Sequence, residues 1–260
     1  MNNSSVCSAI SASRLTRKFG SRVVLNNLYL DIAEGESVAI VGTNGSGKTT
    51  LLRCLAALMR LSGGEVRWFG HPAADKPASS KLVGMVAHDG FLYPHLTGRE
   101  NLVFAARMYA VPNPGQRVDA LIQAAGLEPY AFRHTRKLSR GVRQRLSILR
   151  AMVHDPKILI LDEPFAALDA AGAVWLSSLL QDLRGRGCAI CFTTHDLRLA
   201  HAHADRVLEI RFGVLEIVEN TSAVSRLIIG IDRNVFFRDT VGNKEVSHAE
   251  EIYCSLIERG

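Results

Sequence analysis

Gly42-Thr43-Asn44-Gly45-Ser46-Gly47-Lys48-Thr49 is the stretch that decides the fold of this chain. It has the form G-x-x-x-x-G-K-[ST] and follows the apolar run 37–41, which is typical of a buried strand. Small residues at a strand end let consecutive backbone N–H groups turn around phosphate oxygens, and the positive end of the next helix faces them. The sequence therefore predicts a phosphate-binding loop, followed by an apolar helix over residues 50–59.

Two side chains at the end of this loop can bind phosphate and metal. The ammonium of Lys48 can reach the β- and γ-phosphates of a nucleotide, and the hydroxyl of Thr49 can take one coordination position of Mg²⁺. We therefore expect the loop, together with Thr50 in the first turn of the helix, to bind a nucleotide with its metal. A glycine turn without a ligand is the weaker alternative.

The composition indicates a globular protein. The chain has 260 residues with an apolar fraction of 47%, enough for one large or two small compact units. It has no continuous apolar run long enough to span a bilayer, and Met1-Asn2-Asn3-Ser4-Ser5 does not resemble a secretion signal. We therefore expect a protein that stays in the cytosol.

The cysteines and the excess of basic residues give weaker indications. Five scattered cysteines favour free thiols in a reducing compartment, and Cys188 and Cys191, although spaced C-x-x-C, lie in a segment typical of a buried strand. The formal net charge is +6, and basic residues crowd residues 133–145. A solvated helical face explains most of this charge; attraction to an anionic membrane is a weaker alternative, and nucleic acid is weaker still.

Patterns along the chain predict an α/β fold with an insert. Alternation over residues 12–35 indicates an antiparallel β lobe beside the nucleotide, and the capping box Thr97-Gly98-Arg99-Glu100 opens a helix. Residues 95–153 are predicted as an all-helical subdomain, inserted between the core halves of about 12–94 and 154–213. Strands and helices alternate in the second half, which favours a mainly parallel sheet covered by helices.

Residues 221–260 fit neither lobe and are predicted to form an extension to the main domain of residues 1–220. Ser247-His248-Ala249-Glu250 is a second capping box, and apolar residues follow it at helical spacing. The pattern predicts a terminal amphipathic helix.

A second apolar strand ends in two carboxylates, Asp162 and Glu163. In a parallel sheet they would lie beside the phosphate loop, where Asp162 can hold Mg²⁺ and Glu163 can accept a proton from the attacking water. The stretch 138–145 precedes this strand and opens a helix, so Ser139, Gly141 and free backbone N–H groups there could bind another phosphate.

With these motifs in order, the chain resembles the ATP-binding-cassette (ABC) ATPases over about residues 12–213. The resemblance implies a P-loop ATPase core of ABC type, ATP and Mg²⁺ as its ligands, and ATP hydrolysis. The motifs, in chain order, are Phe19, the phosphate loop, the signature stretch 138–145, the strand ending in Asp162 and Glu163, Ala167-Leu168-Asp169, and His195 after a further strand.

The resemblance also implies individual roles. Phe19 would stack on adenine, Glu163 would be the catalytic base, and His195 would contact the γ-phosphate. Ser139 and Gly141 would close on ATP held by the opposite subunit. Asp169 would link the two sites across the dimer. The alternatives are plain core for Phe19, a satisfied strand-end histidine for His195, and a helix N-cap for Asp169.

The chain departs from the family pattern at several positions. The family usually has Gln where this chain has His88, and imidazole is a poorer Mg²⁺ ligand than an amide oxygen, so His88 acts through water or Asp89 shares its task. Arg140 and Val142 replace the common Gly and Gln of the signature, and Ala167 replaces a usual Gly. His88, residues 92–97 and 138–141, and Trp175 together resemble the haem-exporter ATPases of cytochrome c maturation.

The resemblance implies an ATPase subunit that energises a membrane exporter through an ATP-sandwich dimer, with haem export as the finer expectation. The partners would be a polytopic permease and a second copy of the chain, at the cytoplasmic face of the inner membrane; no nucleic acid is expected. The alternative is a non-transport ABC ATPase acting on ribosomes or nucleic acid, although such relatives usually carry two cassettes or a long coiled coil. A small kinase or GTPase would not explain the signature stretch.

Overall fold

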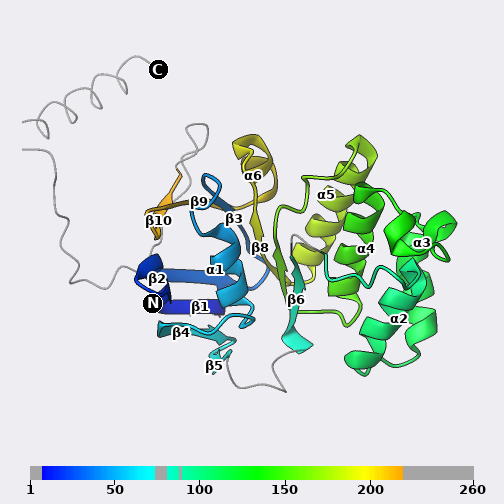
Figure 1. The fold of residues 1–260 in the computed structure, drawn as a ribbon, viewed down its shortest axis with the longest axis horizontal. Helices are drawn as coiled ribbons and strands as arrows, with labels where there is room; N and C mark the ends of the chain where they lie inside the picture. Colours follow the sequence, from blue (N-terminus) through cyan, green and yellow to red (C-terminus); the bar gives the residue numbers. More distant parts are fainter. Residues whose placement is uncertain (1–7, 74–80, 88–89, 219–260) are drawn as a thin grey trace, which may run out of the picture. The chain divides into compact units, whose positions relative to one another are not determined.

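Two β-sheets and a group of helices make up the part of the chain that the computed structural model describes, residues 8–73, 81–87 and 90–218 (Figure 1). The first sheet is antiparallel with the strand order β2-β1-β4-β5. Its strands are β1 (Ser8–Phe19), β2 (Arg22–Ala33), β4 (Gly63–Trp68) and β5 (His71–Pro72). The antiparallel lobe predicted from the alternation over residues 12–35 is confirmed.

The second sheet carries the phosphate loop near its centre. Its order is β10-β9-β3-β8-β7-β6, and all its pairs are parallel except that of β10 with β9. The strands are β3 (Ser37–Val41), β6 (Val83–Val86), β7 (Ile158–Leu161), β8 (Ala189–Thr193), β9 (Arg206–Arg211) and β10 (Val214–Ile217). Every residue of β3, β6, β7 and β8 is buried, as expected for parallel strands covered on both faces.

Helix α1 (Lys48–Leu55) lies between the two sheets. Leu51, Leu52 and Leu55 of α1 belong to the same buried cluster as apolar side chains of β1, β2 and β3. The helix ends before residue 59, so the predicted end was wrong. Ala57 takes a left-handed conformation (φ 52°), and the N–H of Leu58 bonds back to the carbonyl of Arg53 at 2.9 Å, which closes the last turn.

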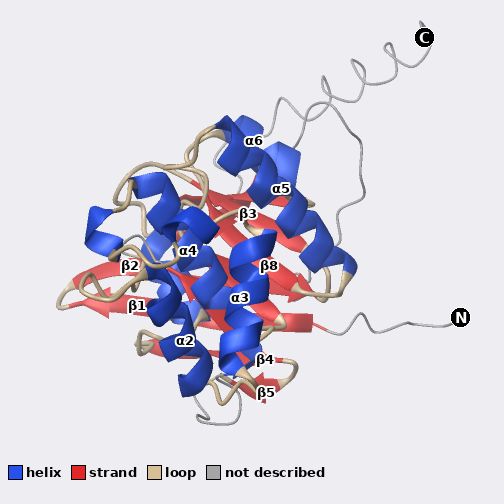
Figure 2. Cartoon of the chain, turned by 90° about the vertical axis from the view of Figure 1, so that its right-hand side faces the viewer, coloured by secondary structure: helices blue, strands red, loops and turns tan. Residues whose placement is uncertain are grey.

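The other face of the parallel sheet is covered by α5 (Ala170–Gly185), α6 (Leu197–His203) and part of α4 (Arg140–Met152). Helix α4 also belongs to the insert, where it shares a separate buried cluster with α2 (Gly98–Met108) and α3 (Pro114–Ala124). Figure 2 shows these three helices side by side in front of the sheets. Two 3₁₀ turns, η2 (Glu128–Tyr130) and η3 (Thr135–Lys137), lead from α3 to α4.

Two local features fix the position of the insert. The capping box is confirmed: the Thr97 hydroxyl accepts from the Glu100 N–H at 3.2 Å, and the Glu100 carboxylate accepts from the Thr97 N–H at 2.8 Å. Gly84 of β6 lies so close to α4 that a Cβ there would come within 2.2 Å of the Ala151 carbonyl. A glycine at this position therefore lets α4 pack directly on the sheet.

Cys188 and Cys191 are buried, and burial raises the pKa of each thiol to about 12, as expected for inert core cysteines. Within the described ranges there is no cluster of metal-ligating side chains and no helix that could span a membrane. The predicted terminal helix, His88 and Asp89 lie outside the described residues.

Candidate functional site

The phosphate loop joins β3 to α1 through three glycines in the left-handed region, Gly42 (φ 146°), Gly45 (φ 80°) and Gly47 (φ 110°). A Cβ on Gly42 would lie 2.9 Å from the carbonyl oxygen of Ile210 on the neighbouring strand. Only glycine fits this conformation and this space. The loop therefore turns tightly enough for its backbone N–H groups and the start of α1 to face one ligand.

Two polar side chains of the loop, Lys48 and Ser46, can donate hydrogen bonds to an anion. Lys48 is only 8% exposed, and its ammonium donates to the carbonyls of Gly42 at 2.7 Å and Thr43 at 3.1 Å. The buried hydroxyl of Ser46 has no hydrogen-bond partner within the described part of the chain. Because buried polar groups are nearly always paired, this loop has the character of a site completed by a polar ligand.

Asp162 lies at the end of β7, beside the loop, and both oxygens of its carboxylate are engaged. One accepts from the Thr49 hydroxyl at 2.8 Å and the other from the Thr193 hydroxyl at 2.7 Å. The side chain is 3% exposed. The carboxyl ends of β3, β7 and β8 meet at one edge of the parallel sheet, which is where ligands bind in such folds.

Glu163 follows Asp162 in a left-handed conformation (φ 49°), which is uncommon for a residue other than glycine. Its N–H donates to the Thr193 hydroxyl at 2.8 Å, so Thr193 links the two acidic residues. Its carboxylate lies 3.3 Å from Nδ1 of His195, whose ring is largely exposed. Strained residues of this kind cluster at functional sites.

The phosphate loop and the two acidic residues after β7 border a cavity of about 490 Å³. It is lined by Phe19, Arg22, Val24, Asn44, Gly45, Gly47, Lys48, Thr49, Thr50, Asp162 and Glu163. Phe19 is 45% exposed, so the interpretation of this residue as plain core is wrong. The Arg17 guanidinium carbon lies 4.4 Å from the Phe19 ring centroid, so one face of the ring is covered and the ring is held in place.

Sequence reasoning missed Arg17, Arg22 and Thr193. Arg17 and Arg22 flank Phe19 in the chain, which is the one sequence signal for them. Thr193 precedes the predicted His195 by two residues, but no spacing rule connects it to Asp162.

Ser139, Gly141 and Asp169 do not line this cavity. Ser139 is the N-cap of α4, where its hydroxyl accepts from the Val142 N–H at 3.3 Å. Gly141 packs closely on the loop after β7, since a Cβ there would lie 2.8 Å from the Ala167 carbonyl. Asp169 caps α5 by accepting from the Gly172 N–H at 2.8 Å, so the N-cap interpretation of Asp169 is confirmed.

Comparison with known proteins supports the same family. The family model described as ABC transporter matches residues 25–166. The spermidine/putrescine import ATP-binding protein PotA of Pasteurella multocida is 34% identical over 90% of this chain, which spans 63% of the length of that relative. The sulfate/thiosulfate import ATP-binding protein CysA of Pseudomonas syringae pv. tomato is 32% identical, covering 94% of this chain and 83% of the relative.

A solved structure agrees with these matches. It is a dimeric, post-hydrolysis state of the ATP-binding cassette MJ0796 bound to ADP and Pi, with a TM-score of 0.72 and 28% identity; the match covers 80% of this chain and 96% of that chain. The predicted α/β fold of ABC type is thereby confirmed. The chain belongs to the ABC transporter family, as one of its ATP-binding proteins.

Proposed function

We propose that this chain binds ATP with Mg²⁺ and hydrolyses it to energise a membrane permease. The observation that supports this most directly is the hydrogen-bond network at the phosphate loop, from Thr49 through Asp162 and Thr193 to Glu163. This network joins the loop that would hold the phosphates to the residue that would activate water. All of its members lie on the same sheet edge or at the start of α1.

ATP would lie in the cavity with its phosphates on the loop. Lys48 would exchange its two carbonyl partners for the β- and γ-phosphate oxygens, and Phe19, held by Arg17, would stack on adenine. The Thr49 hydroxyl and the Asp162 carboxylate are hard oxygen donors that fit Mg²⁺. When bound, this ion neutralises negative charge that develops on the phosphates.

Glu163 would serve as the general base. Its strained backbone and its bond to Thr193 fix the start of the side chain, and the contact with His195 orients the carboxylate. Water would lose a proton to Glu163 as its oxygen attacks the γ-phosphorus. His195, which is exposed on its other side, would then be free to contact the γ-phosphate.

A second copy of the chain would complete the site. Ser139 and Gly141 lie at the start of α4 outside the nucleotide cavity, which fits the proposal that they close on ATP held by the opposite subunit. Asp169, already fixed as a helix cap, would contact the partner beside that site. The neighbouring solved structure is itself described as dimeric.

The permease would dock where the core meets the insert, at the cytoplasmic face of the membrane. A cavity of about 240 Å³ there is lined in part by Leu58, Phe91, Tyr109 and Arg150. Leu58 is 55% exposed and Phe91 43%, and exposed apolar side chains beside a cavity mark interaction surfaces. His88 is three residues before Phe91 and would transmit the state of the nucleotide to this surface.

The expectation of haem export finds no support in the relatives described above, because both are named for import. Both are transport proteins, which favours transport over an action on ribosomes or nucleic acid. We therefore propose ATP-driven transport, in which the permease would select the transported substrate.

The decisive experiment is Glu163→Gln, which keeps the shape of the side chain and removes the base. We expect ATP binding to persist, hydrolysis to stop and the trapped ATP to hold two copies together. Gel filtration with ATP and steady-state phosphate production measure the two effects. Glu128→Gln, on an exposed turn of the insert, is the matched control. Rapid hydrolysis by Glu163→Gln would exclude Glu163 as the base.

A further inference from the structure

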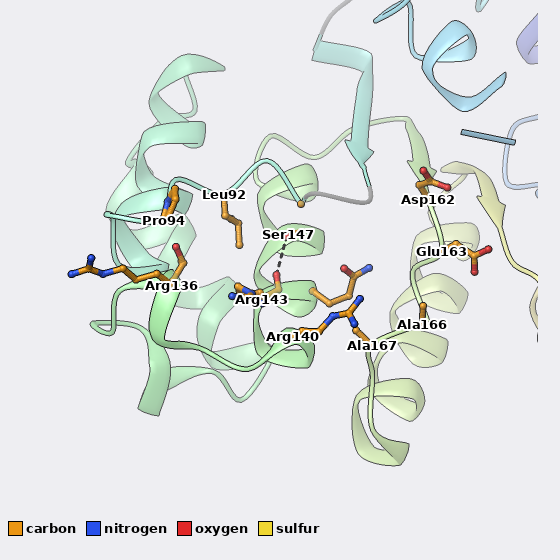
Figure 3. Close-up of a pocket in the computed structure, with 13 residues that line it drawn as sticks. Leu92, Pro94, Arg136, Arg140, Arg143, Ser147, Asp162, Glu163, Ala166 and Ala167 are labelled. Carbon is orange, nitrogen blue, oxygen red and sulfur yellow. Dashed lines mark hydrogen bonds between the residues drawn. The ribbon is translucent and has the colours of Figure 1, made fainter. Parts of the chain in front are cut away.

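A second cavity of about 390 Å³ adjoins the nucleotide cavity, and Asp162 and Glu163 line both (Figure 3). On the other side of the second cavity stand Arg140, Arg143 and Ser147 of α4, and Ala167 lies at its edge. We refer to this cavity, defined by those six residues, as the basic chamber. It opens between the core and the insert, and Phe19 lines the nucleotide cavity but not this second one.

The guanidinium groups of Arg140 and Arg143 have no partner among the residues that the structure describes. Arg140 and Arg143 lie about one turn apart on α4, and none of the ion pairs, side-chain hydrogen bonds or ring contacts found in residues 8–73, 81–87 and 90–218 involves either guanidinium. In Figure 3 the Arg140 side chain extends from α4 toward Ala167, whereas the Arg136 guanidinium points away from the cavity.

The carboxylates opposite are already engaged on the nucleotide side. Asp162 accepts from Thr49 and Thr193, and Glu163 is in contact with His195. Neither carboxylate forms an ion pair with Arg140 or Arg143 among the residues that the structure describes. Positive charge in a partly enclosed space favours an anion, and guanidinium groups suit phosphate oxygens in particular.

We propose that the basic chamber takes up the inorganic phosphate produced by hydrolysis, so that phosphate and ADP leave by different routes. This inference rests on the proposed ATPase function. In the reaction, water oxygen bonds to the γ-phosphorus and the bond from the γ-phosphorus to the bridging oxygen breaks, which leaves ADP and inorganic phosphate. The phosphate is produced beside Glu163, at the boundary shared by the two cavities.

The charges then act on the two products differently. The phosphate anion is repelled by the carboxylates of Asp162 and Glu163 and attracted by Arg140 and Arg143 on the far wall. ADP stays on the phosphate loop, where Lys48 and the backbone N–H groups hold its remaining phosphates.

The first test measures binding of inorganic phosphate by calorimetry in the Lys48→Ala protein, in which the phosphate loop has lost its cation. We expect phosphate still to bind, and we expect additional Arg140→Gln and Arg143→Gln changes to weaken it by about tenfold or more. Arg136→Gln, whose guanidinium points out of the cavity, is the matched control and should leave phosphate affinity unchanged. Equal affinity in the Arg140→Gln/Arg143→Gln protein would overturn the proposal.

The second test compares two rates in a single turnover of the otherwise unchanged chain. Acid quenching gives the rate at which phosphate forms, and a fluorescent phosphate-binding protein gives the rate at which it appears in solution. In Arg140→Gln we expect the ratio of release to formation to fall by about tenfold, and Arg140→Lys to restore much of it. Release that keeps pace with formation in Arg140→Gln would refute the exit route. Failure of the unchanged chain to hydrolyse ATP would refute the proposed function instead, and the calorimetric test would still decide on the chamber.

Discussion

Thr193 links the two acidic residues of the site, and replacing it gives the most specific prediction. It is fully buried, its hydroxyl donates to Asp162 at 2.7 Å, and the same hydroxyl accepts from the Glu163 N–H at 2.8 Å. Thr193→Val nearly preserves the shape of the side chain and removes both bonds at once. The change therefore isolates the network from the packing around it.

The expected loss follows from the two bonds. A hydrogen bond to an ionised group contributes about 1.5–3 kcal/mol, and one between neutral groups contributes about 0.5–1.5 kcal/mol. The added methyl group of Val, buried against the core, offsets about 0.8 kcal/mol. We therefore expect the free energy of unfolding to fall by about 1–4 kcal/mol. Because Asp162 and Glu163 lose their common anchor, ATP hydrolysis should fall on the order of tenfold to a hundredfold.

Urea unfolding and steady-state ATP hydrolysis measure the two effects. Thr193→Ser is the matched control, since it keeps the hydroxyl and loses one methyl group; it should lose about 1 kcal/mol of stability and keep most of its activity. A Thr193→Val protein within 0.5 kcal/mol of the unchanged chain, roughly the error of such a comparison, would refute the reasoning. So would a Ser variant that is less stable or less active than the Val variant.

Two further predictions concern other parts of the molecule. Lys48→Ala should lower ATP affinity by about a hundredfold or more in calorimetry, because a cation that serves two phosphates is lost; unchanged affinity would contradict the phosphate-loop assignment. Burial lowers the pKa of His154 to about 4, and its buried Nδ1 has no partner in the described structure; the contact of Nε2 with the Val83 carbonyl at 3.2 Å acts in the opposite direction and offsets only part of this shift. Because the folded pKa lies below the unfolded value of about 6.5, the unfolded chain takes up the proton first, so stability should be full above pH 6.5 and fall by about 2 kcal/mol toward pH 4. His154→Gln should flatten this dependence in urea titrations, and parallel losses in both proteins would show that other groups cause it.

Features that depend on neighbouring residues could be predicted from the sequence. The phosphate loop and the Thr97 capping box are each set by a few consecutive residues. Their backbone conformation and hydrogen bonds depend on neighbours in the sequence. The strand ending in Asp162 and Glu163 was predicted for the same reason, and its place beside the loop followed because parallel strands share one edge. Strand β10, with four residues, is too short to show a period and was missed.

The contacts that complete the site are set only by the tertiary structure. Thr193 lies 31 residues from Asp162 in the chain, and their bond exists because β7 and β8 pair in one register. The basic stretch 133–145 was interpreted mainly as a solvated helical face, yet packing of α4 against β6 places Arg140 and Arg143 in a chamber opposite two carboxylates. The sequence by itself determined the family, the phosphate loop and the acidic pair, because these are local patterns. Which side chains face each other across strands and lobes depends on register and on packing between distant segments. These contacts are therefore set only when the whole chain folds.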